Sequence, residues 1–182
     1  QEPFFLGVGF FKPHLPFTAP QKYWELYKEK EIPLSPVPGI PQNIHTASLH
    51  NSNEFNQYEL GEEKAAIDKQ LSDAYARKLR HAYYASISYV DAQIGRVLDE
   101  LERLGLEDNT IVVLWGDHGW HLGDHRVWGK HTLFDTALKT PLIIKAPGIT
   151  AKIIASDQIV SSIDIYPTLM ELCDIKVDFP LD

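Results

Sequence analysis

The feature that most constrains the fold is a long amphipathic segment followed at once by an apolar one. Across residues 71–104, apolar side chains recur at spacings of three and four, which predicts one long helix. Gly105 follows directly and suits the left-handed position that ends a helix. After a turn at residues 107–109, residues 110–115 form an apolar, β-branched run of strand length. A helix, a tight turn and a fully apolar strand in this order predict an α/β fold with a mainly parallel sheet.

Other segments predict the rest of this architecture. Residues 4–11 are apolar and aromatic, which predicts a buried strand, and residues 140–146 predict another. Ile159-Val160 is read as a short strand, and Ser161 with Asp164 as a capping box that begins a last helix. The segment of about residues 13–70 is first proline-rich and then polar. It therefore predicts a long, irregular surface excursion rather than a regular helix or a central strand.

Length, composition and charge limit the class of protein. The chain has 182 residues, of which 44% are hydrophobic and 23% charged, as expected for a folded domain. A net charge of −8 argues against nucleic acid or an anionic membrane as a partner, although a local group of cations can still hold one anionic ligand. No run approaches the ~20 apolar residues of a membrane span. The first residues do not form a signal peptide, and we expect both ends to lie within a longer protein.

Cys173 is the single cysteine, so the chain cannot form an internal disulfide. The residue lies in the predicted last helix. Because a free cysteine is usually buried, we expect a buried thiol there. Cysteine usage therefore says little about the cellular compartment.

Two predicted strands end in polar, titratable residues. Ligands of open α/β sheets bind outside the carboxyl ends of the strands. The strand 110–115 ends in Gly116-Asp117-His118-Gly119, and the strand 4–11 ends in Lys12-Pro13-His14. An adjacent carboxylate and imidazole suit half of a metal site. They equally suit an ordinary polar loop in which the aspartate caps the next helix.

The stretch after the Asp117-His118 pair is unusually rich in titratable groups. It holds His121, His125, His131 and Lys130 within a few residues. A lysine near a tetrahedral oxyanion supplies a positive charge and a donor, and can protonate a leaving oxygen if its pKa is lowered. His14, between two prolines, suits a fixed donor to an anion or a simple turn. Taken singly, His121 and His131 are read as packing histidines, and Lys130 as a surface lysine.

Six blocks, taken together and in order, resemble the type I sulfatases of the alkaline-phosphatase superfamily. The nearest branch is that of iduronate-2-sulfatase-like enzymes, with choline-sulfatase-like enzymes next. The blocks are Phe11-Lys12-Pro13-His14-Leu15-Pro16-Phe17, Tyr84–Asp91 with Gly95-Arg96, Asp117–His125, Trp128-Gly129-Lys130, Pro141-Leu142-Ile143 and Asp164–Leu169. The resemblance implies an α/β domain with a mixed, mainly parallel sheet flanked by helices. Residues 1–182 would form a single partial catalytic domain, with the excursion at about 13–70.

The same resemblance implies roles for individual residues. Asp117 and His118 match the late pair of metal ligands, most often for Ca²⁺, with Zn²⁺ or Mg²⁺ as alternatives. Lys130 matches the lysine that binds the sulfate and assists the leaving group. His14 matches the histidine that holds the sulfate near the leaving oxygen. His125 falls in a stretch of this branch to which we assign substrate binding without a defined role.

Two departures from the wider family matter. Most sulfatases have Asp-Asn where this chain has Asp117-His118, and imidazole is an unusual ligand for Ca²⁺. The iduronate-2-sulfatase-like branch shares the histidine, but so do zinc phosphodiesterases and phosphatases of the superfamily. In addition, no Cys/Ser-x-Pro-x-Arg motif is present to supply the formylglycine nucleophile, and the early metal ligands are missing too. We therefore expect a missing N-terminal part of the same protein to complete the site.

Three functions remain open from the sequence. The first is a metal-dependent sulfuric ester hydrolase acting on a sulfated carbohydrate, such as 2-O-sulfated iduronate in glycosaminoglycan degradation. The second is a metal phosphodiesterase or phosphatase of the same superfamily, and the third a non-catalytic fragment that binds sulfated glycans. Residues 18–70 are expected to set specificity, and this chain alone to be inactive. The resemblance implies an extracytoplasmic location: periplasmic, secreted or lysosomal.

Overall fold

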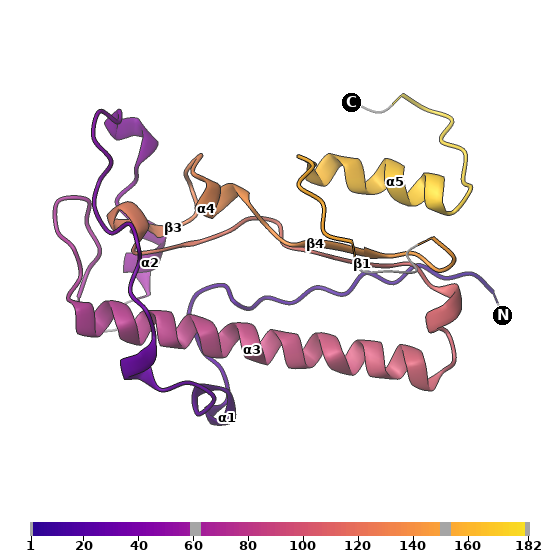
Figure 1. Cartoon of the computed structure of the whole chain (residues 1–182), viewed down its shortest axis with the longest axis horizontal. Helices are drawn as coiled ribbons and strands as arrows, with labels where there is room; N and C mark the ends of the chain where they lie inside the picture. Colours follow the sequence, from indigo (N-terminus) through magenta and orange to yellow (C-terminus); the bar gives the residue numbers. More distant parts are fainter. Residues whose placement is uncertain (1, 59–62, 150–153, 181–182) are drawn as a thin grey trace. The chain divides into compact units, whose positions relative to one another are not determined.

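The structure is a computed structural model that describes residues 2–58, 63–149 and 154–180 (Figure 1). The chain divides into two compact units. The first comprises Gln1–Glu100 and His118–Lys139, and the second comprises Leu101–Asp117 and Thr140–Asp182. The expectation of a single partial domain stays a prediction.

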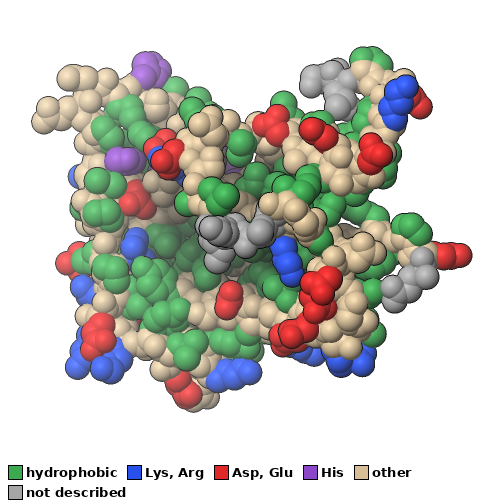
Figure 2. Space-filling model, turned by 45° about the vertical axis from the view of Figure 1, so that its right-hand side comes forward, with side chains coloured by type: hydrophobic (Ala, Val, Ile, Leu, Met, Phe, Trp, Pro, Cys, Tyr) green, Lys and Arg blue, Asp and Glu red, His purple; other side chains and the backbone are tan. Residues whose placement is uncertain are grey.

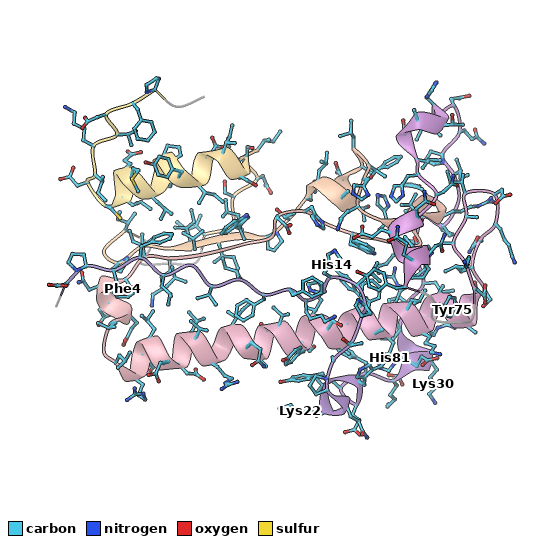
Figure 3. All side chains as sticks on the ribbon, turned by 180° about the vertical axis from the view of Figure 1, so that it is seen from behind. Phe4, His14, Lys22, Lys30, Tyr75 and His81 are labelled. Atoms are coloured by element: carbon cyan, nitrogen blue, oxygen red, sulfur yellow. The ribbon has the colours of Figure 1, made fainter. Side chains whose placement is uncertain are left out.

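Helix α3, Asp73–Arg103, is the longest element and confirms the predicted helix. Ser72 caps its start, because its hydroxyl accepts a hydrogen bond from the Tyr75 backbone N–H at 3.2 Å. The buried side chains in its first half recur at helical spacing, as an amphipathic helix requires. Tyr75 and His81 project from this half in Figure 3, and His81 Nε2 lies 2.9 Å from the Trp24 carbonyl oxygen.

The hydrophobic core of the first unit joins this helix to segments far away in the sequence. Leu15 is fully buried and packs with Phe17, Phe55, Trp120 and Trp128 in one cluster with the start of α3. Full burial of one large apolar side chain stabilises a fold by roughly 1.5–3 kcal/mol. The core therefore fixes the chain close to positions 14, 54 and 130, where the candidate site described below lies.

Within its described residues, 13–58 and 63–70, the excursion contains only short helical elements, as its prolines predict. These are α1 (Gln21–Trp24), the 3₁₀ helices η1 (Glu29–Glu31) and η2 (Thr46–Ser48), and α2 (Asn53–Gln57). Long-range contacts hold it in place. The Ser35 hydroxyl donates to the Asp124 carboxylate at 2.7 Å, and Arg77 Nε donates to the Ile32 carbonyl oxygen at 3.2 Å.

A short antiparallel hairpin completes the first unit. It pairs β2 (His121–Leu122) with β3 (Trp128–Gly129) around the 3₁₀ helix η4 (Asp124–Arg126). Helix α4, Asp135–Leu138, follows it. The buried Asp124 carboxylate accepts the Leu122 backbone N–H at 3.1 Å as well as the Ser35 hydroxyl, so one side chain closes the hairpin and ties it to the excursion.

The second unit contains the predicted strands. β1 (Val112–Trp115) pairs antiparallel with β4 (Leu142–Lys145), with Val113 opposite Ile144. Gly105, at a φ of +64°, ends α3 as predicted. Its N–H bonds to the Glu102 carbonyl oxygen and that of Leu106 bonds to Leu101, which is the Schellman arrangement. The 3₁₀ helix η3, Glu107–Asn109, forms the turn before β1.

The last helix also begins as the sequence predicts. The Ser161 backbone N–H donates to the Asp164 carboxylate at 2.7 Å, and a reciprocal bond completes the capping box. The 3₁₀ helix η5 (Ser162–Asp164) leads into α5 (Ile165–Leu172). Both strand pairs among the described residues are antiparallel, so the parallel pairing expected between neighbouring strands is not found there.

Three local predictions are wrong. Residues 4–11 form no strand among the described residues, and Phe5 is 90% exposed. Ile159 and Val160 are exposed and do not form the predicted strand. The Cys173 thiol is exposed, whereas the sequence predicts a buried one. An apolar run becomes a strand only where a neighbour supplies backbone partners and a face to bury. Figure 2 shows hydrophobic side chains spread widely over one face of the molecule.

Candidate functional site

The candidate site is a cluster of three side chains in the first unit. Lys130 Nζ lies 3.1 Å from His14 Nε2 and 3.1 Å from Glu54 Oε1. His14 Nε2 lies 3.0 Å from the same Glu54 oxygen. The structure thus brings together the two residues, 116 positions apart, to which the sequence assigns chemistry at the sulfate. It adds a carboxylate to them.

His14 is held by its own loop. Its Nδ1 lies 2.9 Å from the Leu15 carbonyl oxygen, which can only accept, so Nδ1 carries a hydrogen. The Lys12 ammonium donates to the carbonyl oxygens of His14, at 3.2 Å, and Pro16. In Figure 3, His14 projects from the segment that precedes α1. Because Nδ1 is committed to the backbone, Nε2 is the ring atom left for chemistry.

Lys130 follows β3 and is largely enclosed, with 16% of its side chain exposed. Its ammonium lies 5.3 Å from the centroid of the Trp120 ring, a cation–π contact. The preceding residue, Gly129, packs against the His50 ring. A Cβ at this glycine would come within 2.5 Å of His50 Cε1, so the chain needs glycine there. The Lys130 backbone is therefore fixed by a side chain from the excursion.

Glu54, in α2, is the member of the cluster that sequence reasoning missed. Its burial raises the pKa of the carboxyl group. The hydrogen bond and charge of Lys130, with the charges of His14 and His131, outweigh this and lower the pKa, so the side chain is an anion. Its position comes from Phe55, whose ring packs 5.7 Å from that of Trp128. A local pattern gives no signal for such a residue within a polar excursion.

Two further histidines flank the cluster. The rings of His50 and His131 lie 5.7 Å apart at a steep angle. His50 Nδ1 accepts the Ser52 backbone N–H at 3.0 Å. Burial and the neighbouring His131 lower the pKa of His50, although Glu54 acts in the opposite direction. His50 is therefore a neutral packing group beside Gly129.

His121 and His125 lie elsewhere in the hairpin. His121 is fully buried, and its Nε2 lies 2.7 Å from the Thr132 hydroxyl, in agreement with its reading as a packing histidine. His125 adopts a left-handed backbone with a φ of +56°. Its Nδ1 lies 3.2 Å from the Gly39 carbonyl oxygen, and its ring 4.5 Å from that of Phe134. These contacts hold the excursion, and a role of His125 in substrate binding stays a prediction.

Asp117 and His118, the predicted metal ligands, are both exposed. They fall in different units, so their geometry as a pair is not described. His118 Nδ1 lies 2.7 Å from the Gly119 carbonyl oxygen, which can only accept, so Nδ1 carries a hydrogen. Metal-binding histidines commonly show this arrangement, so His118 fits the role. Among the described residues, no group of three or more His, Cys, Asp or Glu side chains is placed to hold a metal.

Gly119, the residue after this pair, lies in close contact with the backbone of α4. Its N–H donates to the Ala137 carbonyl oxygen at 2.7 Å. A Cβ here would overlap the carbonyl oxygen of Thr136. A glycine is thus required where the chain enters the hairpin from His118.

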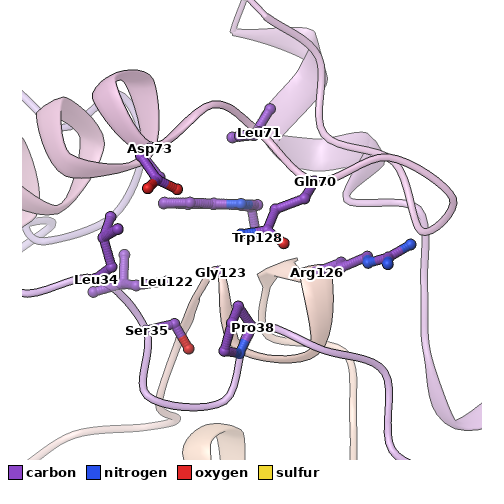
Figure 4. Close-up of a pocket in the computed structure, with 11 residues that line it drawn as sticks. Leu34, Ser35, Pro38, Gln70, Leu71, Asp73, Leu122, Gly123, Arg126 and Trp128 are labelled. Atoms are coloured by element: carbon purple, nitrogen blue, oxygen red, sulfur yellow. The ribbon is translucent and has the colours of Figure 1, made fainter.

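A separate pocket of about 250 Å³ lies between the excursion, the start of α3 and the hairpin (Figure 4). Trp128 forms part of its wall, and Arg126 and Asp73 supply opposite charges. The Arg126 guanidinium donates to the Ile67 carbonyl oxygen at 3.0 Å. None of His14, Glu54 and Lys130 lines this pocket.

The described residues form a mixed helix-and-strand framework in which Lys130 and His14 lie 3.1 Å apart. Comparison with known proteins identifies the class: the sulfatase family model matches residues 1–175, and the chain belongs to that family. The expected fold class, α/β of the alkaline-phosphatase and sulfatase type, is thereby confirmed.

Individual known proteins are similar to this chain over most of its length. Iduronate 2-sulfatase of Mus musculus is 38% identical over 86% of this chain and 29% of its own. Choline-sulfatase of Rhizobium meliloti is 32% identical over 98% of this chain and 33% of its own. A solved phosphonate monoester hydrolase from Silicibacter pomeroyi superposes with a TM-score of 0.55 at 33% identity, over 75% of this chain and 27% of its own. The chain spans about a third of the length of these relatives.

Proposed function

We propose that the full-length protein carrying this chain is a metal-dependent sulfuric ester hydrolase, and that this chain supplies His14 and Lys130 to its active site. The observation that carries the proposal is the meeting of Lys130 Nζ and His14 Nε2 at 3.1 Å. An ammonium and an imidazole at one point can bind a sulfate oxygen and reach the leaving oxygen of the same ester.

Each residue has a defined task in this proposal. Lys130 binds the sulfate as a point charge, kept in place by the Trp120 ring. His14 Nε2 donates a proton to the leaving oxygen as its bond to sulfur breaks. Asp117 and His118 would hold a divalent cation, Ca²⁺ by family expectation, which would neutralise charge on the sulfate when bound. The nucleophile, a formylglycine by family expectation, belongs to the part of the protein outside this chain.

The substrate we propose is a sulfated carbohydrate, such as a 2-O-sulfated uronic acid. Support comes from the iduronate 2-sulfatase similarity. Residues 18–70 would contact the sugar, since Glu54 and His50 of this excursion already border the site. We also propose an extracytoplasmic location, by family expectation. As a separate finding, no helix within residues 2–58, 63–149 and 154–180 is both long and apolar enough to cross a membrane.

A second candidate function is hydrolysis of phosphate or phosphonate esters. The similarity to a phosphonate monoester hydrolase, at 33% identity, favours it. The imidazole of His118 also suits Zn²⁺ better than Ca²⁺. Both reactions need a cation beside a tetrahedral anion, so the cluster of Lys130 and His14 serves either.

The test uses the full-length protein and its Lys130→Ala and His14→Ala variants. We expect hydrolysis of 4-nitrophenyl sulfate to exceed that of 4-nitrophenyl phenylphosphonate. Lys130→Ala should lose at least about 100-fold in kcat/KM with 4-nitrophenyl sulfate, and His14→Ala at least about 100-fold with an alkyl sulfate, whose leaving oxygen needs a proton. Lys139→Ala is the matched control, because Lys139 is an exposed lysine paired with Asp135 at 2.9 Å. Faster phosphonate hydrolysis would favour the second function. Binding of sulfated glycans without turnover would favour a non-catalytic role.

A further inference from the structure

We propose that Glu54 is a positioning residue of the hydrolytic site, which holds the reactive proton on His14 Nε2 and balances the charge of Lys130. The inference rests on the function proposed above. It follows from one carboxylate oxygen that lies 3.0 Å from His14 Nε2 and 3.1 Å from Lys130 Nζ.

The two ring nitrogens of His14 have different partners. Nδ1 already donates to the Leu15 carbonyl oxygen, so the proton that His14 gives away must sit on Nε2. Lys130 Nζ, 3.1 Å away, opposes a positive charge there. The Glu54 carboxylate can only accept hydrogen bonds, and it offsets the lysine charge at the same distance. Without this anion, the protonated imidazole would face an unbalanced ammonium.

The placement of Glu54 is built into the fold. Helix α2 is fixed by Phe55 in the core and by Asn56, whose side-chain amide exchanges two hydrogen bonds with the Ala65 backbone, at 2.8 and 2.9 Å. The Glu54 side chain is 27% exposed. The other charged or titratable groups that act on it are Lys130, His14 and His131, and all three lower the pKa of its carboxyl group against the opposing effect of burial.

The charge of the substrate indicates whether Glu54 acts on substrate binding or on the chemical step. A sulfate ester is an anion, so a carboxylate beside the sulfate-binding lysine weakens affinity rather than increasing it. Glu54 therefore acts on the chemical step. The nucleophile from outside this chain donates an electron pair to sulfur and forms a new bond to it. The bond between sulfur and the leaving oxygen breaks in the same step, and that oxygen keeps its electron pair and takes the proton from His14 Nε2. His14 then regains a proton from a hydronium ion of the solvent.

The experiment compares two sulfate esters in the full-length protein and its Glu54→Gln variant. 4-Nitrophenyl sulfate has a leaving group that needs no proton, whereas an alkyl sulfate or sugar sulfate does. We expect kcat for the second ester to fall by about 10- to 100-fold and kcat for the first by no more than about 3-fold. KM should stay equal or fall for both esters. Glu54→Asp, which keeps the charge, should recover part of the lost kcat.

Glu31→Gln is the control, since Glu31 is an exposed glutamate paired with Lys28 at 3.2 Å, and it should match the unmodified protein. Equal losses on both esters, a raised KM with unchanged kcat, or no effect would each overturn the inference. If Glu54→Gln does not fold, the ratio of the kcat values for the two esters in Glu54→Ala, which also removes the charge, decides: a ratio equal to that of the unmodified protein overturns the inference. An unmodified protein that cleaves neither ester refutes the proposed function itself.

Discussion

At the scale of single residues, Gly129 shows how closely the candidate site is packed. A methyl group there would press on the His50 ring at 2.5 Å, and either the ring or the backbone before Lys130 would have to move. Overpacking of this kind typically destabilises a protein by about 1–3 kcal/mol. We expect Gly129→Ala to lower both the unfolding temperature and kcat of the full-length protein, measured by calorimetry and by ester hydrolysis.

Gly39→Ala provides the comparison for this prediction, since no atom lies within 4 Å of the position where its Cβ would be. It should leave both measurements nearly unchanged. An unaltered kcat in Gly129→Ala would contradict the idea that His50 fixes the backbone before Lys130.

A buried histidine predicts a pH dependence of stability. Burial lowers the pKa of His121 below its ordinary value of 6.5, although Asp124 acts in the opposite direction. Below pH 6.5 the unfolded chain therefore binds a proton that the folded chain does not, so the free energy of unfolding falls as the pH falls. His121→Gln should reduce the difference between urea unfolding curves at pH 7.5 and 5.5. The same difference in protein and variant would refute this assignment; His45→Gln, at an exposed site, is the control.

The residues of the site differ in how far the sequence can predict them. His14 and Lys130 belong to motifs, so the family resemblance singles them out from the amino-acid sequence. Glu54 belongs to no motif, and its approach to Lys130 depends on the packing of Phe55 against Trp128. Side chains placed by long-range packing leave no local pattern to read.

At the scale of elements, Gly105 illustrates a prediction that rests on backbone conformation alone. Its φ of +64° disfavours any residue with a Cβ by roughly 1–2 kcal/mol. Gly105→Ala should lower the unfolding temperature by several degrees. Gly95→Ala, inside α3 where no atom lies within 4 Å, should raise it, because alanine favours a helix by about 1 kcal/mol over glycine. Changes of equal sign would refute the assigned roles.

Elements with strong local signals were predictable. α3 follows from the periodicity of its apolar residues, β1 and β4 follow from apolar runs of strand length, and the start of the last helix follows from its capping box. Residues 4–11 carry an equally strong apolar signal but form no strand among the described residues, because strand formation depends on a partner. The antiparallel pairing of β1 with β4 was also beyond the local pattern, which fixes the strand but not its neighbour.

At the scale of the whole molecule, the chain covers about a third of the length of its relatives, and its sequence contains no Cys/Ser-x-Pro-x-Arg motif. We expect the 182-residue chain alone to show no turnover of 4-nitrophenyl sulfate, whereas the full-length protein turns it over and loses activity in a chelator. Turnover by the isolated chain that depends on added metal would contradict the expectation that the nucleophile lies elsewhere.

The contacts among His14, Glu54 and Lys130 also bear on how the protein folds. They join residues 116 and 76 positions apart, so two long loops must close before the ammonium meets its partners. Loop closure of this length slows folding, since its entropy is lost before the contacts form. We therefore expect these contacts to form late in folding. A sulfate ion that binds only the assembled cluster would shift the folding equilibrium toward the native state in proportion to its concentration.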